Sequence, residues 1–173
     1  MFCAFRDSFC QWDERKKTTP YGQAPLLTVN GQELAQSSAI VRFVAQRHGL
    51  AGSGDIEAAL IDGGYEAVQD IRKAFFTNKA DAAKLEQFWS TGFGQALAFL
   101  NKNVRGETFF GASNKLSYTD LAIYYLIFVL STENKEAVDA ALAQNAKIQT
   151  IFSAVEKDEK IAAYLAKREV TPM

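Results

Sequence analysis

Ser37 is the residue whose type and position most clearly suggest ligand binding. It stands at the start of an apolar pattern with helical spacing, in which Ile40, Phe43 and Val44 fall on one face. The first N–H groups of a helix have no partner within it and lie at the positive end of its dipole. They can therefore bind an anion, and the Ser37 hydroxyl can add a further hydrogen bond. Ser37 is also expected to be an ordinary helix cap, worth about 1 kcal/mol of helix stability, and the two roles are compatible.

The cysteine and histidine content excludes several kinds of site. The two cysteines, Cys3 and Cys10, do not form a Cys-x-x-Cys pair, and the sequence has one histidine. This content excludes a disulfide scaffold and a structural zinc site, and it favours a reducing compartment. A thioredoxin-like redox protein would need a reactive cysteine at the start of a helix. Neither cysteine is followed by a helical pattern, so we do not expect that activity.

Length and composition suit a small globular protein. The 173 residues are 48% hydrophobic, which is enough for one domain or two small ones and excludes a disordered chain. The 19 Lys and Arg residues balance 20 Asp and Glu residues without a long run of either sign, so we expect no binding to nucleic acid. The longest apolar run, Leu121 to Leu130, is too short to cross a membrane, and the N-terminus lacks a signal-peptide pattern. We expect a soluble protein of the cytoplasm.

A β-hairpin is predicted over residues 26–34, directly before the helix that begins near Ser37. The pair Asn30-Gly31 lies between two short apolar runs, and both residues tolerate the positive φ of a type I′ turn. Gly49 suits the left-handed position that follows the last turn of the helix. Pro20 and Pro25 bracket the segment before the hairpin, and the simplest interpretation is that they frame a loop.

From Asp55 onward the apolar spacing is helical. Gly52-Ser53-Gly54 is the expected boundary between a small mixed unit and an all-helical one. The segment from Ser117 to Asp120 has the spacing of a capping box, and the apolar helix after it is expected to be central in the bundle. The other predicted helical faces are Ile56, Leu60, Ala67, Val68, Ile71 and Phe75; Leu85, Phe88, Trp89, Ala96, Leu97 and Leu100, weakened by Gly92 and Gly94; Ile148, Ile151, Phe152 and Val155; and Ile161 to Ala166.

Several ordered motifs together resemble the glutathione transferase family. Residues 18–25, the hairpin and residues 34–45 are similar to its glutathione-binding half. Residues 117–120, 163–165 and 171–172 are similar to its helical half. The class that the sequence resembles is sigma, which includes hematopoietic prostaglandin D synthase and the S-crystallins. The resemblance implies an α+β fold, with a partial thioredoxin-like domain over 1–51 and an all-α domain over 55–173.

The resemblance also implies that one part of the family pattern is missing. Members begin with a strand and a helix that carry a tyrosine whose hydroxyl activates the glutathione thiol, whereas this sequence starts where their second strand would be, near Phe5. The first domain is therefore expected to lack that strand and helix, and the catalytic residue is unknown. Ser8 and Cys10 are weak substitutes. Tyr21 stands where the family commonly has Phe, so we expect it to pack.

The middle of glutathione would be bound by the loop before the hairpin. In the family the equivalent of the Ala24–Pro25 peptide bond is cis, and the main chain of the residue before the proline pairs with the cysteinyl residue like an added strand. The resemblance assigns Gly22 and Gln23 to the same loop. Gln36 and Ser37 would bind the γ-glutamyl end.

The glycyl carboxylate would be bound by Trp12 and Lys16, although without the resemblance these would be a packing residue and a solvated charge. Asp70 matches a residue that crosses the family's dimer interface to the partner's ligand; its alternative is a surface pair with Arg72 or Lys73. The carboxylates that bind a divalent ion in prostaglandin D synthase are reduced to Glu66 and Gln69 beside Asp70, so we predict no metal.

The implied function is conjugation of glutathione to small apolar electrophiles, or isomerisation of such molecules with glutathione as cofactor, in a homodimer. The electrophile pocket is expected between the two halves, near Phe93, Phe99 and the C-terminal tail. Activity is uncertain because the activating tyrosine is missing. The alternative is a non-catalytic structural or binding protein, like the S-crystallins.

Overall fold

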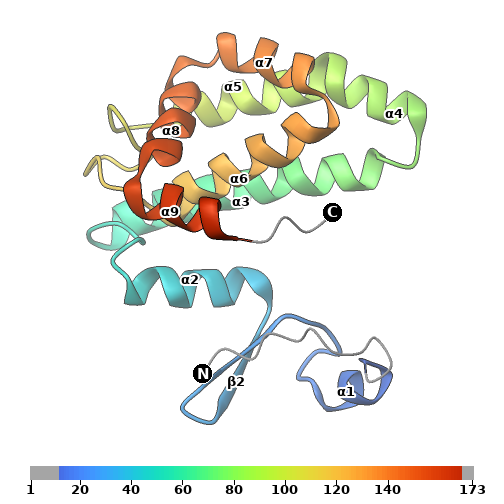
Figure 1. The fold of residues 1–173 in the computed structure, drawn as a ribbon, viewed down its shortest axis with the longest axis vertical. Coiled ribbons are helices and arrows are strands. Elements are labelled where there is room, and N and C mark those ends of the chain that lie inside the picture. Colours follow the sequence, from blue (N-terminus) through green and yellow to red (C-terminus); the bar gives the residue numbers. More distant parts are fainter. Residues whose placement is uncertain (1–11, 169–173) are drawn as a thin grey trace. The chain divides into compact units, whose positions relative to one another are not determined.

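The structure, a computed structural model, describes residues 12–168. The chain divides into two compact units, the first ending at Gly49 and the second beginning at Leu50 (Figure 1). This division falls just before the Gly52–Gly54 segment that was expected to separate them. Among the residues described, no helix is both long and apolar enough to cross a membrane.

The first unit contains a β-hairpin between two helices. Its elements are α1 (Trp12–Thr18), β1 (Leu26–Val29), β2 (Gln32–Ala35) and α2 (Ser37–Arg47). The strands pair antiparallel with Leu26 opposite Ala35. The predicted turn is confirmed, because Asn30 and Gly31 both have positive φ, 50° and 78°. The sequence analysis assigned no helix to the residues of α1.

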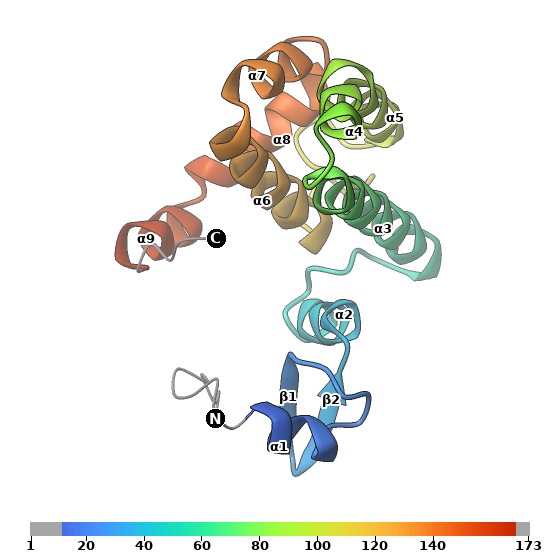
Figure 2. The same ribbon diagram turned by 90° about the vertical axis from the view of Figure 1, so that its right-hand side faces the viewer.

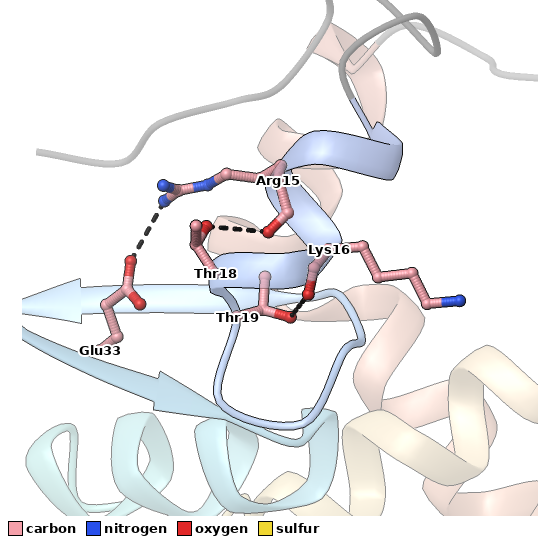
Figure 3. A network of polar contacts seen from close by, with 5 residues as sticks. All are labelled: Arg15, Lys16, Thr18, Thr19 and Glu33. Atoms are coloured by element: carbon pink, nitrogen blue, oxygen red, sulfur yellow. Dashed lines mark hydrogen bonds and ion pairs between the residues drawn. The ribbon is translucent and has the colours of Figure 1, made fainter.

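Polar contacts attach α1 to the hairpin (Figure 3). Nη2 of Arg15 donates to Oε1 of Glu33 on β2 at 3.1 Å, and the pair is partly exposed. The hydroxyls of Thr18 and Thr19 donate to the carbonyls of Arg15 and Lys16 at 2.9 and 3.0 Å, which satisfies acceptors at the C-terminus of α1. Of these contacts only the Arg15–Glu33 pair joins α1 to the hairpin, and because exposed ion pairs contribute little to stability it adds little to the stability of the unit.

The N-terminus of α2 differs from the prediction at one position. The residue before the first helical turn is Gln36, with a φ of 71°, and Ser37 is already helical. The prediction that Ser37 caps the helix is therefore wrong, because a capping side chain must come from the residue that precedes the helix. At the other end the prediction is confirmed, since Gly49 has a φ of 69°.

The second unit is entirely helical in its described part. Its elements are α3 (Asp55–Asn78), α4 (Ala82–Gln87), a π-helical turn η2 (Phe88–Gly92), α5 (Phe93–Asn103), α6 (Tyr118–Glu133), α7 (Lys135–Ala143), α8 (Ala146–Lys157) and α9 (Glu159–Lys167). As predicted, α6 is central: it contacts α3, α7 and α8 (Figure 2). The sequence analysis did not separate α7, and it treated α4 to α5 as one weakened helix.

The buried face of α3 begins later than predicted. Val68, Ile71 and Phe75 are buried as expected, but Ile56 is 77% exposed and Leu60 is 38% exposed. Instead, Ile61 and Gly64 face α6, whose Thr119 hydroxyl donates to the Ile61 carbonyl at 2.6 Å. A Cβ on Gly64 would lie 2.5 Å from the ring of Phe110, so the absence of a side chain permits this close approach.

The predicted capping box at the start of α6 is confirmed, and its Asp120 side chain also binds the loop that precedes the helix. Oδ2 of Asp120 accepts from the Ser117 N–H at 2.8 Å and from its hydroxyl at 2.6 Å, and the Ser117 hydroxyl accepts from the Asp120 N–H. Oδ1 also accepts from the N–H of Phe110 at 2.7 Å, which fixes the loop before the helix. Burial raises the pKa of Asp120, while the hydrogen bonds from Ser117 and Phe110 act in the opposite direction.

Candidate functional site

Lys16 and Gly22 are neighbours in the first unit. Gly22 has a φ of 64°, and a Cβ at that position would lie 3.8 Å from Cε of Lys16, so the lysine side chain runs beside this loop. Figure 3 shows that side chain leaving α1 on a different side from the Arg15–Glu33 pair. Within residues 12–168 the Lys16 ammonium has no ion-pair partner, whereas that of Lys17 pairs with Glu14 at 2.8 Å. Lys16 is thus available to an anion.

Gln23 and Gln36 connect the same loop to the N-terminus of α2. Nε2 of Gln36 lies 3.5 Å from Oε1 of Gln23, which is at the limit of a hydrogen bond. In the described part of the chain no side chain caps α2, so the N–H groups of its first turn remain available beside these amides. Amide donors and the positive end of a helix dipole together suit a carboxylate ligand.

The remaining predicted residues of the first unit lie on the same loop or on α1. The Ala24–Pro25 peptide bond is cis, as the resemblance implied, and both residues are exposed. Trp12 is half-buried in the first turn of α1. It precedes Lys16 by four residues, so the two lie on one face of that helix.

Asp70 belongs to the second unit, so the chain does not bring it into the first unit with the other predicted residues. It is exposed on α3 and lines a groove of about 720 Å³ between α3 and the segment from α4 to α5. Glu66 and Gln69 lie on the same helix, and the described residues contain no cluster of ligands that could hold a metal ion. The role of Asp70 at a partner's ligand stays a prediction.

The sequence analysis did not predict this groove beside α3. Small residues form much of its α3 wall, and α5 contributes Phe99, which is 71% exposed. A sequence signal existed, because Ala59, Gly63 and Ala67 recur every four residues and therefore share one helix face. Lys84 and Arg105 also line the groove, so it carries charges of both signs.

Three expectations about single residues are wrong. Phe93 cannot line an electrophile pocket, because it is 1% exposed and packs against Phe88 and Trp89. Tyr21 does not pack, since it is 66% exposed in the loop between α1 and β1. A helix does follow Cys10, because α1 begins at Trp12.

Some expectations fall outside the described residues. These are the strand near Phe5, the candidates Ser8 and Cys10, the residue Cys3 and the tail at 171–172.

The comparisons with known proteins agree with the fold. Residues 66–168 match the family model described as "Glutathione S-transferase, C-terminal domain". The probable glutathione S-transferase 6 of Caenorhabditis elegans is 29% identical over 178 residues, covering 95% of this chain and 83% of the relative. The solved structure of prostaglandin synthase D of Nilaparvata lugens is 28% identical with a TM-score of 0.76, covering 93% of this chain and 82% of that one.

A further solved structure shows the fold alone. Monomeric Na-GST-3 of Necator americanus, a glutathione S-transferase, has a TM-score of 0.75 at 23% identity, covering 94% of this chain and 82% of that one. The predicted α+β class, with a thioredoxin-like unit followed by a helical one, is confirmed. The sequence match and the fold agree, and the chain belongs to the glutathione S-transferase family.

Proposed function

We propose that the protein is a sigma-like glutathione transferase of the cytoplasm. Its first unit would bind glutathione, and the thiol would be added to small apolar electrophiles or used as a cofactor to isomerise them. The observation that carries the proposal is the N-terminus of α2, which is not capped by a side chain of the described residues and lies beside the loop amides of Gln23 and Gln36. The proposed glutathione-binding residues are Trp12, Lys16, Gly22, Gln23, Ala24, Pro25, Gln36 and Ser37, with Asp70 acting on the ligand of a partner subunit.

The chemistry of glutathione matches these positions. The N–H groups at the start of α2, which no side chain of residues 12–168 caps, and the Ser37 hydroxyl can bind the γ-glutamyl carboxylate, and the Gln36 amide can bond the same group. The ammonium of Lys16, which has no ion-pair partner within residues 12–168, can neutralise the glycyl carboxylate at the other end of the tripeptide. Ala24 is an exposed residue, and its main chain can pair with the cysteinyl residue between them.

Calorimetric titration with glutathione tests the site. The wild-type chain is expected to bind, and Lys16→Ala is expected to weaken binding about tenfold, because a charge-assisted hydrogen bond to the carboxylate is lost. Lys17→Ala is the matched control, since it removes the neighbouring ammonium, which already pairs with Glu14. A wild-type chain that gives no binding heat, or equal losses in the two variants, would contradict the proposed site.

Turnover of chlorodinitrobenzene by the same preparation distinguishes a catalytic transferase from a non-catalytic binding protein. Glutathione binding without turnover would favour the non-catalytic alternative, since activation of a thiol needs a hydrogen-bond donor that lowers its pKa. Turnover would favour the enzyme, and it would mean that the chain supplies such a hydrogen-bond donor to the thiol.

A homodimer is part of the proposal, and the groove beside α3 is the surface that a second copy would cover. Most residues of its α3 wall are small or apolar, it has the exposed ring of Phe99 on α5, and its lining includes Asp70 together with the cationic Lys84 and Arg105. Exposed apolar surface of this kind marks interaction sites in soluble proteins.

Analytical ultracentrifugation tests the dimer. Gly63→Arg is expected to raise the dimer dissociation constant about a hundredfold, because it places a charged side chain in the groove. A Cβ on Gly63 meets no atom within 4 Å, so the monomer can accept the change. Gly94→Arg is the control: its site on α5 is equally open and does not line the groove. A wild-type chain that sediments as a monomer, the state described for Na-GST-3, would overturn the dimer.

A further inference from the structure

Glu57 connects two loops of the second unit through its carboxylate. It lies in the first turn of α3, and each of its oxygens accepts one backbone N–H. Oε2 accepts from Ser53 at 2.7 Å, and Oε1 accepts from Ser113 at 2.6 Å. Ser53 belongs to residues 50–54, which join the two units, and Ser113 belongs to the loop before α6. One side chain therefore holds the connecting segment against a loop far away in the sequence.

These bonds also favour the ionised form of the side chain. The N–H groups of Ser113 and Ser53, in that order, lower the pKa of Glu57, and the charge of Lys115 adds to the effect. Because the folded pKa lies below the ordinary value of 4.5, the contribution of Glu57 to stability is present above that pH and is lost as the pH falls through the lowered value.

The rest of the connecting segment is attached to the second unit as well. The carbonyl of Leu50 accepts from the N–H of Tyr118 at 3.0 Å. Gly52 has a φ of 87°, and a Cβ there would lie 2.7 Å from Cδ1 of Ile61. Only glycine fits a position that combines positive φ with so close an approach. Gly52 and Ser53 therefore contact the helical unit, although the composition of Gly52-Ser53-Gly54 is that of a flexible linker and all three residues are exposed.

Gly49, the residue before this segment, has different surroundings. It also has positive φ, 69°, but a Cβ there would meet no atom within 4 Å. Its N–H donates to the carbonyl of Gln46, so it ends α2 and belongs to the first unit. The attachment of the connecting segment to the second unit therefore begins at Leu50, where the chain divides.

We propose that Glu57 is a positioning residue of the transferase: by holding Ser53 and Ser113 it fixes the path along which residues 50–54 enter the helical unit. The role rests on the proposed function, in which the first unit supplies the glutathione thiol and the electrophile must be presented to it. A fixed connection limits the orientations that the two units sample, and productive catalysis requires reacting groups to be held in one geometry.

Native-state proteolysis tests the attachment. Elastase cleavage after Ala51 of the full chain is expected to be about tenfold faster in Glu57→Ala than in the wild type, because both charge-assisted hydrogen bonds are lost and cleavage follows the population of the opened segment. Asp55→Asn is the matched control, since it removes a carboxylate from the same turn of α3 that, among residues 12–168, makes no hydrogen bond or ion pair with Ser53 or Ser113. Val155→Ala, in the core of α8, is the control for global destabilisation. Equal cleavage in Glu57→Ala and Asp55→Asn would overturn the proposal.

Spin-label distances test the positioning role itself. Labels are placed on Gln46→Cys in α2 and Lys102→Cys in α5, with Cys3 and Cys10 replaced by serine. Glu57→Ala is expected to broaden the distance distribution under conditions in which circular dichroism shows a folded protein, and Asp55→Asn is expected to leave it unchanged. An unchanged distribution in Glu57→Ala would overturn the proposal.

Glutathione titration of the same variants separates this inference from the proposed function. Binding by Glu57→Ala is expected to equal that of the wild type, because Glu57 lies in the helical unit and the proposed glutathione residues of this chain's first unit are unaltered. If neither protein binds glutathione while the distribution still broadens, the proposed function fails and the attachment of the segment stands.

Discussion

Asp120→Ala is expected to lower the free energy of unfolding of the helical unit by about 4 kcal/mol, since two buried backbone N–H groups lose their acceptor at about 1–3 kcal/mol each. These are the N–H groups of Phe110 and Ser117, and both residues are almost fully buried, so water cannot replace the carboxylate without opening the loop. The Ser117 hydroxyl loses its acceptor as well.

Urea denaturation followed by circular dichroism measures the effect. Asp120→Asn keeps one acceptor oxygen and is expected to recover about half of the loss. Asp139→Ala serves as the surface control, because Asp139 makes an exposed ion pair with Lys135 that is worth about 1 kcal/mol or less. A loss for Asp120→Ala no larger than for Asp139→Ala would show that the loop does not depend on the carboxylate.

The adjacent glycines Gly63 and Gly64 are expected to respond to alanine in opposite directions. Gly64→Ala should lower the free energy of unfolding by about 2 kcal/mol, because the new Cβ would lie 2.5 Å from the ring of Phe110 and 3.0 Å from the methyl of Thr119, and overpacking outweighs the gain in helix propensity. Gly63→Ala should raise it by about 0.5–1 kcal/mol, because its Cβ points into open space.

The pair forms its own control, since both changes occur in one helix and have the same effect on helix propensity. Thermal and urea unfolding of the two variants at one protein concentration give the comparison. Stabilisation by both alanines would mean that α3 and α6 are not held as closely as the Gly64 contact requires.

Elements with short-range signals were predictable from the sequence. The Asn30-Gly31 turn and the Ser117–Asp120 capping box depend on residues a few positions apart, and both are confirmed with the predicted residues. The central position of α6 was equally accessible, because a helix that is apolar on all sides must be surrounded.

Features that depend on distant contacts were not predictable. The short helix α1 has no buried residue and is attached to the hairpin through Glu33, which its own sequence does not reveal. The buried face of α3 begins at Ile61 because of Phe110 and Thr119, which lie in a later part of the chain.

The residues of the candidate site were predicted from the family resemblance, and their residue types alone would not have identified most of them. In the sequence Lys16 is an ordinary lysine; its position beside Gly22, and its lack of an ion-pair partner among the described residues, are properties of the folded chain. Ser37 was identified as a helix start, but the positive φ of Gln36 that shifts the cap is a property of the folded chain. Tyr21 was assigned to packing from the residue type that the family commonly has there, and its exposure depends on the loop around it.

The π-helical turn from Phe88 to Gly92 affects how this chain should be aligned with others. An i→i+5 turn contains one residue more than an α-turn, so the side chains from Phe93 onward are rotated by about 100° from where an uninterrupted helix starting at Ala82 would place them. A homologue that is regular through this stretch would match only with a single-position gap near residue 90. Deletion of one residue within the π-helical turn would convert it to an α-turn and leave the buried side chains of Leu97 and Leu100 facing the core. Deletion of one residue two turns later, in regular α-helix, would rotate the side chains that follow it away from the core.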